Sequence, residues 1–468
     1  MQSEFSKIKH LYNRFGFGLS TDIIKRASSL NAEINLLLNN NSVCQKLETV
    51  SQEDVEKAKE IFKNNTDDKI KDLKKLLKSN VFELNSLWFQ QMINNSNQLQ
   101  EKMSLFWHSN LACRSANPYF DQLYLDIIRQ QALGNFGDLL KSVAKTPAML
   151  QFLNGQQNRK EHPNENFARE VMELFTLGRG NYSEQDVKEA ARAFTGWGFD
   201  KTGNFKFRWQ WHDAGMKTIF GKSGSFNGDD VIDMLLANPQ TAYHITEKIY
   251  RHFVNENGNA TRVKQLSANF FSSNYDIRKL LTEIIQSDWF YMAENMGNRI
   301  KTPVELLAGI FRIVPVVFES PDSLVFMERA LNQILLNPPN VAGWKGGTAW
   351  IDSSSLLLRM KLPQYLFYDT SMNFTAKDIM PEMDSSTAYK SAFVNQLAHT
   401  KLKGTPDWTN AEHVFSSIDK DSVAQYLLAV PLANTAKQIL AKMEVSDAIN
   451  PLHQRIIYTM SLPEYQLN

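Results

Sequence analysis

The segment from Glu161 to Trp197 constrains the fold more than any other part of the chain, because it reads as a helix, a tight turn and a second helix. Asn164 suits the N-cap of the first helix, since its side chain can accept hydrogen bonds from amides of the first turn. The glycines of Gly178–Gly180 suit a helix exit that needs a left-handed residue. Ser183, with Asp186 three residues later, predicts a capping box for the second helix.

The first of these helices has one polar face on a helical wheel. That face comprises Glu165, Asn166, Arg169, Glu170 and Glu173. A solvated surface with ion pairs one turn apart would explain it. However, lysine is frequent in other polar helical segments and absent from residues 161–187, and arginine paired with carboxylates is favoured in buried or ligand-facing networks. The face is therefore either solvated surface or a buried polar network, structural or functional.

Composition places the chain among globular proteins. Hydrophobic residues make up 43%, charged residues 22%, and the formal net charge is +1, which argues against a dedicated nucleic-acid binder. Neither Cys44 nor Cys113 has a neighbour at zinc-site spacing. The N-terminus as written lacks the apolar segment of a signal peptide, and the most apolar stretch, 304–318, is too short and too charged to span a bilayer. A cytoplasmic location and export with a partner both remain open.

Helical spacing recurs along most of the chain and predicts a mainly α-helical protein. The exception follows Trp197, where aromatic residues at 205, 207, 209 and 211 alternate with polar ones, a pattern typical of a strand. We expect this strand to turn at 212–215 and return over 217–221, giving one small hairpin near 204–221. The expected architecture is one compact unit, with a helical core over 1–360 and a C-terminal helical portion, 361–468, packed on it.

His108 lies in FWHSNLACR, on a predicted helix. It is either a hydrogen-bonded core residue or, if it faces the central helix, a metal ligand or general base beside Glu170 or Glu173. His212 and Asp213 end the aromatic strand, and with Lys217 they form either a ligand-binding rim or an ordinary turn in which the aspartate bonds its own backbone.

Two groups of basic residues admit both a functional and a structural interpretation. His244, Lys248 and His252 recur at every fourth residue, as an anion-binding stripe or as a solvated face. Arg299 and Lys301 precede a predicted helix start, where they would hold a phosphate or carboxylate, or simply face solvent.

A stiff loop over residues 337–350 is dense in proline, glycine and tryptophan and contains Trp344. It either walls a pocket or connects packed helices without binding a ligand. The chain contains none of the standard hydrolase, zinc-protease, dinucleotide or P-loop motifs, so no reaction follows from a motif.

Several segments, in order and over nearly the whole chain, resemble the bacterial family known as domain of unknown function 1800. They are Asn13–Gly18, Phe106–His108, Asn164–Gly178, Tyr182–Trp197, Trp211–Thr218, Lys248–Val254, Arg299–Leu306, Asn337–Gly347 and the terminal SLPEYQLN. The resemblance implies an exported companion protein similar to sulfatases and alkaline phosphatases. Asn110 and Phe175 stand where many members have histidine, so a metal site built on those histidines would be altered or absent.

Two functions follow as hypotheses. The first is a metal-dependent hydrolase or transferase, with a divalent metal held by Glu170, Glu173 and His108. In it His212 would be a ligand or acid and Arg169 an anion clamp. The predicted ligand-binding residues are Glu165, Asn166, Asp186, Arg192, Lys217, Lys248, Lys301 and Trp344. The second is a non-catalytic partner or delivery protein for the exported companion, with a closed polar network and the aromatic hairpin and Trp344 loop as docking surfaces.

Overall fold

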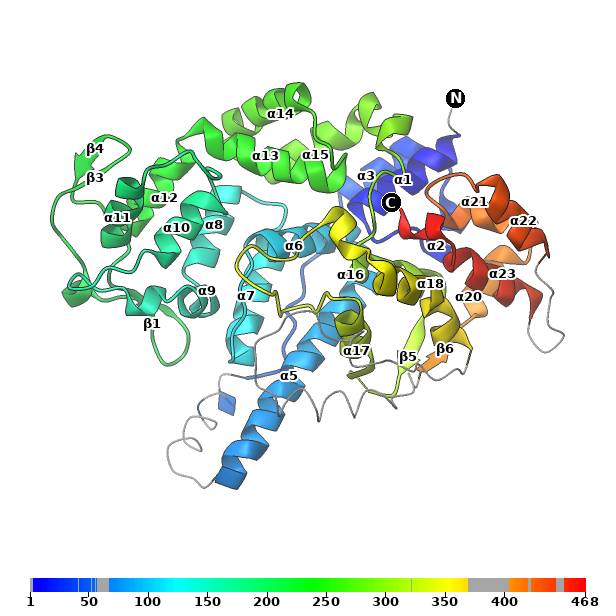
Figure 1. Ribbon diagram of the computed structural model, residues 1–468, viewed down its shortest axis with the longest axis horizontal. Helices are drawn as coiled ribbons and strands as arrows, with labels where there is room; N and C mark the ends of the chain where they lie inside the picture. The colour runs from blue at the N-terminus through cyan, green and yellow to red at the C-terminus, as the bar shows by residue number, and fades with distance from the viewer. Residues whose placement is uncertain are drawn as a thin grey trace.

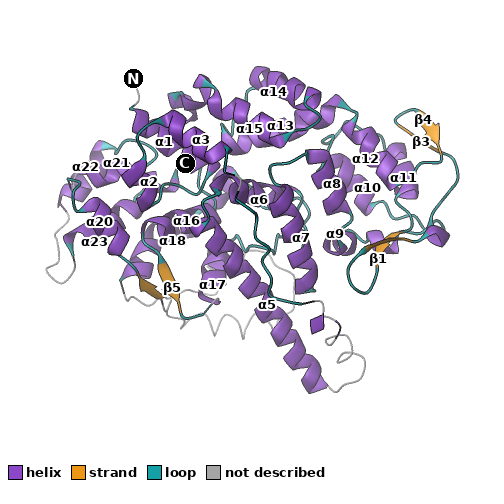
Figure 2. Ribbon diagram, turned by 180° about the vertical axis from the view of Figure 1, so that it is seen from behind, coloured by secondary structure: helices purple, strands orange, loops and turns teal. Residues whose placement is uncertain are grey.

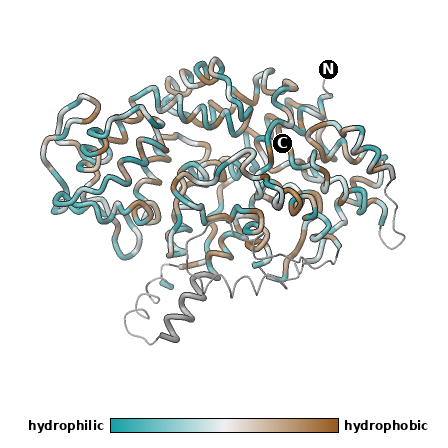
Figure 3. Tube along the Cα trace, viewed as in Figure 1, coloured by the Kyte–Doolittle hydropathy of each residue, from teal (hydrophilic) through white to brown (hydrophobic). Residues whose placement is uncertain are grey.

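A computed structural model describes residues 3–40, 42–51, 53–54, 56, 67–320, 322–368, 404–419, 422–442 and 450–468. These residues form many helices and three small two-stranded antiparallel sheets (Figures 1 and 2), which confirms the mainly α-helical class. Along the described trace, hydrophobic and hydrophilic residues alternate (Figure 3), and none of the described helices is long and apolar enough to cross a membrane.

The first third of the chain supplies the N-terminal helices and the centre of the molecule (Figure 1). The helices are α1 (Glu4–Phe15), α2 (Thr21–Arg26), α3 (Leu30–Leu38), α5 (Asp67–Asn94), α6 (Gln98–Asn110) and α7 (Pro118–Gln131). Serines cap α1, α2 and α3, because each accepts a first-turn amide through its hydroxyl. Helix α6 is buried on all sides from Gln98 to His108 and lies at the centre of the packing.

The middle of the chain forms a lobe at one end of the molecule and a row of helices leading back from it (Figure 1). The lobe contains α8 (Phe136–Ala144), α9 (Pro147–Phe152), η1 (Gly155–Gln157), α10 (Asn166–Glu173), α11 (Glu184–Ala193), β1 (Trp197–Phe199), β2 (Phe205–Phe207), η2 (Trp209–Trp211), β3 (Lys217–Ile219), β4 (Lys222–Gly224) and α12 (Gly228–Leu236). The row contains α13 (Pro239–Phe253), α14 (Ala260–Ser272) and α15 (Ile277–Gln286), followed by η3 (Asp288–Tyr291) and η4 (Ala293–Asn295).

The last third returns to the N-terminal helices. It contains α16 (Pro303–Ile313), β5 (Val316–Phe318), α17 (Asp322–Ala330), η5 (Gly347–Trp350), α18 (Ser353–Phe367), β6 (Gly404–Pro406), α20 (Thr409–Phe415), α21 (Val423–Leu427), α22 (Asn434–Lys442), α23 (Pro451–Met460) and η7 (Pro463–Gln466). Strands β5 and β6 pair across this part of the chain.

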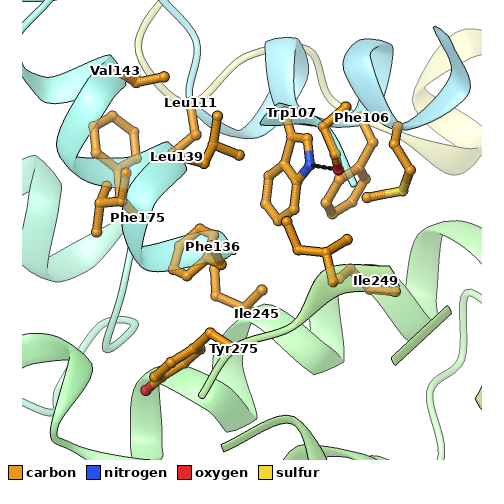
Figure 4. Packing of buried hydrophobic residues seen from close by; sticks show 14 of the residues in the cluster. Phe106, Trp107, Leu111, Phe136, Leu139, Val143, Phe175, Ile245, Ile249 and Tyr275 are labelled. Carbon is orange, nitrogen blue, oxygen red and sulfur yellow. Dashed lines mark hydrogen bonds between the residues drawn. The ribbon is translucent and has the colours of Figure 1, made fainter. Parts of the chain in front are cut away.

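Buried apolar side chains form two clusters, one built mainly from α1, α3 and α6–α15 and one from α5, α16–α18 and α20–α23. Figure 4 shows part of the first, where Phe106 and Trp107 of α6 pack with Ile245 and Ile249 of α13. The Trp107 indole N–H donates to the Ala132 carbonyl at 2.9 Å, so its one polar atom is satisfied inside the cluster.

The strand pairing differs from the predicted hairpin. Strand β2 pairs with β1, and β3 pairs with β4 over residues 217–224. The predicted strand ends at Phe207, because the Trp211 N–H bonds the Arg208 carbonyl at 2.9 Å and the chain turns into η2. A side chain at Gly198 would collide with the Arg208 guanidinium, with its Cβ 2.4 Å from Nη1.

Candidate functional site

The α10–α11 pair is built largely by local signals. Ser183 and Asp186 form the predicted capping box, and Gly178 and Gly180 have φ angles of +80° and +84°. The N-cap of α10 is Glu165 rather than Asn164, although the Asn164 side chain does accept the Asn166 amide at 3.0 Å.

The polar face of α10 is a surface of ion pairs. Arg169 bonds Glu165 at 3.0 Å and Glu184 at 2.7 Å, and its side chain is 33% exposed. Asn166 is exposed. Of the two interpretations of this face, the solvated surface therefore describes Glu165, Asn166 and Arg169.

Glu170 and Glu173 have different surroundings. Glu173 accepts bonds from the Tyr182 hydroxyl and, at 3.0 Å, from Arg179 Nε, and the tyrosine bond is the main cause that lowers the pKa of Glu173. Glu170 is half-buried, and burial, with the nearby charge of Glu173, raises its pKa. Within the described residues, the Glu170 carboxylate forms no ion pair, which leaves it the more available of the two acids.

His108 is part of the core and away from the α10 carboxylates. It is fully buried against the rings of Trp88, Tyr124 and Trp344, and burial lowers its pKa to about 3. Its Nε2 accepts the Leu336 amide at 3.1 Å. The histidine therefore fixes the start of the Trp344 loop, and Trp344 packs on the imidazole as a half-buried side chain.

Charged residues on successive turns of α11 hold the loop 212–220. Asp186 accepts the Phe220 amide at 2.7 Å, and Glu189 accepts the Thr218 amide at 3.1 Å. Arg192 bonds Asp213 at 2.7 Å and the Met216 carbonyl at 3.1 Å. These side chains are used within the fold, as anchors of the loop.

His212 and Lys217 complete the same anchor. The His212 ring bonds the Thr195 carbonyl through Nδ1 at 3.0 Å, and burial lowers its pKa. The Lys217 ammonium donates to the carbonyls of Asp213 and Gly215 and is 1% exposed. These contacts fit the interpretation of residues 212–217 as a structural turn rather than as a ligand-binding rim.

Three large apolar side chains in and next to this anchored region face solvent. Phe207 is 38% exposed, Trp209 is 67% exposed and Met216 is 65% exposed. The Phe207 and Trp209 rings lie 6.2 Å apart. We call these three residues the docking face. Next to it, the guanidinium groups of Arg159 and Arg208 lie 3.9 and 4.5 Å from the centre of the Trp211 ring.

The stripe at 244, 248 and 252 packs inward, so its interpretation as a solvated face is wrong. Lys248 donates to the Leu174 carbonyl at 2.6 Å, and burial lowers its pKa to about 8. The Nε2 atoms of His244 and His252 are inaccessible to solvent.

Arg299 and Lys301 are also buried, so they do not form a solvated helix start. They belong to what we call the buried basic cluster, whose cations surround the carboxylate of Glu305. Its members are Lys9, Arg14, Lys102, Arg299, Lys301 and Arg359. Four of these cations, Lys9, Arg14, Lys102 and Arg359, were not predicted from the sequence, because their sequence context is that of any amphipathic helix and only tertiary packing buries them.

The predicted metal ligands do not gather. Among the residues that the structure describes, no group of three or more histidine, cysteine, aspartate or glutamate side chains is arranged to hold a metal ion. Glu170, Glu173 and His108 therefore do not form one coordination set, and the chemistry of a bound metal does not follow from their geometry.

Comparison with known proteins identifies the family of this chain. No curated protein and no solved structure matches the chain. A family model described as "Protein of unknown function (DUF1800)" matches residues 10–467, which is nearly the whole chain, and the protein therefore belongs to that family.

Proposed function

We propose that this chain is a non-catalytic partner protein that binds an exported companion of the sulfatase or phosphatase type, the partner that the family resemblance implies. The proposal rests on one observation, which is that the loop 212–220 is held firmly while large apolar side chains in and beside it are exposed. Charged side chains of α11 hold this loop, while Trp209 and Met216 beside them face solvent. Exposed aromatic and methionine side chains with neighbouring arginines are typical of protein interfaces.

The rigidity of the docking face supports this role. The Met216 carbonyl is tied to α11 through Arg192, Phe207 pairs with Trp197 in the β1–β2 sheet, and the neighbouring Trp211 is held between two guanidinium groups. A surface that is ordered before binding loses less conformational entropy when the complex forms. Three of the charged residues predicted to be chemical, Asp186, Arg192 and Lys217, are engaged within this support, as a partner protein with a closed polar network requires.

The alternative is a metal-dependent hydrolase or transferase centred on α10. Glu170 favours it, because a half-buried carboxylate with a raised pKa suits acid–base chemistry. Against it, Glu173 is bonded to Arg179 and Tyr182, and His108 fixes the Trp344 loop. The partner role therefore accounts for more of the described contacts.

The test is binding of the purified companion protein, measured by biolayer interferometry. We expect wild-type protein to bind, and Trp209→Ser to weaken binding at least about tenfold, or roughly 1.4 kcal/mol. Leu357→Ser is the matched control, because Leu357 is 55% exposed and lies on α18, away from the docking face. Leu357→Ser and Glu170→Gln should both bind like wild type.

Two results would contradict the proposal. One is a wild-type protein that does not bind the companion. The other is elemental analysis that finds near-stoichiometric metal in wild-type protein, purified without chelator, and its loss in Glu170→Gln, since that result would make α10 a ligand helix.

A further inference from the structure

The buried basic cluster lies where both ends of the described chain meet. Lys9 and Arg14 come from α1, Lys102 from α6 and Arg359 from α18, and their exposed fractions range from 0% to 8%. Arg299 and Lys301 immediately precede α16 and are each 5% exposed. Burial of so many cations is costly unless negative charge accompanies them.

One side-chain carboxylate serves this cluster among the described residues. Glu305 accepts hydrogen bonds from Lys102, from Arg299 at 3.3 Å and, at 2.8 Å, from the backbone N–H of Thr302, the N-cap of α16. The side-chain amide of Asn468 adds a fourth contact at 3.3 Å. Glu305 is thus fully engaged, and its single charge balances only one of the cations around it.

Backbone carbonyls hold several of the remaining cations. Lys9 donates to the Gln425 carbonyl at 2.5 Å, and Lys301 donates to the Tyr465 carbonyl at 2.7 Å. Arg359 donates to the Lys301 carbonyl at 2.5 Å. A carbonyl dipole satisfies a donor but does not neutralise a charge, so the cluster keeps an excess of positive charge.

The cluster also has more donors than acceptors. Arg14 Nε and Nη1 and Arg359 Nη1 are inaccessible to solvent and have no hydrogen-bond partner among the described residues. An ammonium group has three N–H donors, whereas Lys102 and Lys301 each bond one described acceptor. Each also lies over an aromatic ring, Lys102 at 5.1 Å from the centre of Phe17 and Lys301 at 3.7 Å from the centre of Tyr465. Buried donors without acceptors favour an additional acceptor that the chain itself does not provide.

A small cavity lies against the two lysines. Its volume is about 20 Å³, and its polar lining includes Lys102, Lys301, Glu305, Tyr465 and Asn468. That is room for roughly one or two water-sized groups. Gly309 also lines it, and a Cβ there would lie 3.6 Å from the Tyr465 hydroxyl, an ordinary contact distance.

We propose that this cavity binds a small monovalent inorganic anion of the size of chloride, held between the ammonium groups of Lys102 and Lys301. The anion would add negative charge to the cluster and accept N–H donors of the two lysines, which line the cavity, whereas Arg14 and Arg359 do not. It would also connect α6 and the segment before α16 to the C-terminal residues 465–468. Burial lowers the pKa of Lys301 to about 7 and that of Lys102 to about 8, while the charge of Glu305 opposes both shifts.

Thermal unfolding in matched salts tests the proposal. The protein is melted in sodium chloride and in sodium gluconate at equal ionic strength, because gluconate is too large for the cavity. We expect chloride to raise the Tm saturably, by roughly 2–4 °C at saturation. Chloride is also titrated into protein in gluconate and followed by isothermal calorimetry. The dissociation constant should agree with the one obtained from the chloride dependence of the Tm.

Three variants localise the effect. Lys301→Met removes one ammonium group, and Gly309→Ala places a methyl group in the cavity without changing any charge; both should lose the chloride-dependent rise in Tm. Lys248→Met is the matched control, since Lys248 is another lysine with a pKa lowered by burial and one carbonyl partner, and it lies on α13, outside the buried basic cluster. It should keep the rise.

Gly309→Ala keeps the test decisive if Lys301→Met does not fold, because alanine favours a helix and its Cβ has ordinary contacts. A wild-type Tm that does not depend on chloride would overturn the proposal, as it would show that the chain and bound water satisfy the lysines. A rise of equal size in wild type and Gly309→Ala would also overturn it. Neither result bears on binding of the companion protein.

Discussion

At the scale of single residues, buried polar groups fix one strained turn. Leu336 has a φ angle of +64°, a value that is unusual for a residue with a branched side chain. Its amide bonds His108, and the preceding amide of Leu335 bonds the Glu328 carboxyl at 3.1 Å. Asn85 donates to the same carboxyl oxygen at 2.6 Å. Two adjacent amides are thus held from two different helices.

Glu328 gives a prediction at this scale. Burial raises the pKa of Glu328 from its ordinary value to about 8. Between about pH 4.5 and 8 the folded protein keeps a proton that the unfolded chain has released. The protonated Glu328 carboxyl therefore contributes stability to the folded protein that is fully present below about pH 4.5 and is lost as the pH rises through 8. Glu328→Gln retains an oxygen for both donors and has no charge to bury.

We expect Glu328→Gln to be more stable than wild type at pH 8, by roughly 1–3 kcal/mol, and equal to it near pH 4.5. Urea unfolding at both pH values measures the difference. Glu48→Gln, at an exposed position, should change little at either pH. A Glu328→Gln protein that is less stable than wild type at pH 8 would show that the carboxyl is ionised in the native state.

At the scale of elements, local signals were predictable from the sequence and packing was not. The capping box of α11 and the glycine exits of α10 depend on residues within a few positions, and both are observed. The partner of β2 was not predictable, because it depends on how closely Arg208 approaches Gly196 and Gly198.

The same limit explains which candidate residues were misplaced. Basic residues at every fourth position form the same pattern on a solvated and on a buried face, and only the position of α13 against α10 places Lys248 inside. His108 was open to both a core and a ligand interpretation, and the rings around it come from α5, α7 and the Trp344 loop. Sequence alone identified the chemistry of each side chain but not its neighbours.

Arg192 provides the prediction at this scale. Arg192→Met removes bonds to Asp213, Glu189 and the Met216 carbonyl, so we expect a loss of roughly 1–3 kcal/mol of stability. Amides of the loop 213–220 should exchange hydrogen faster, and companion binding should fall although Trp209 is unchanged. Hydrogen-exchange mass spectrometry and interferometry measure the two effects.

Arg169→Met is the matched control, because Arg169 also bonds two carboxylates but at the surface of α10. It should cost less than about 1 kcal/mol and leave the loop unchanged. Equal effects of the two substitutions would mean that Arg192 has no special role in holding the docking face.

At the scale of the whole molecule, α6 and α7 join the two apolar clusters. Phe106 and Trp107 of α6 belong to the first cluster, and Leu105 belongs to the second. In α7, Tyr124 belongs to the first and Leu125 to the second. Helices shared in this way couple the clusters, which favours our proposal that the C-terminal portion, 361–468, packs on the same unit as the core.

The prediction is one cooperative unfolding transition, tested with Leu105→Ala. Leu105 is 2% exposed, so the substitution should cost roughly 2–5 kcal/mol through lost burial and the cavity that remains. Because α6 serves both clusters, hydrogen exchange in denaturant should accelerate together in α10–α12 and in α20–α23. Leu357→Ala, at a position 55% exposed, should accelerate neither. Exchange that rises in α20–α23 alone would mean that the C-terminal portion unfolds separately, and that the two clusters are cores of distinct domains.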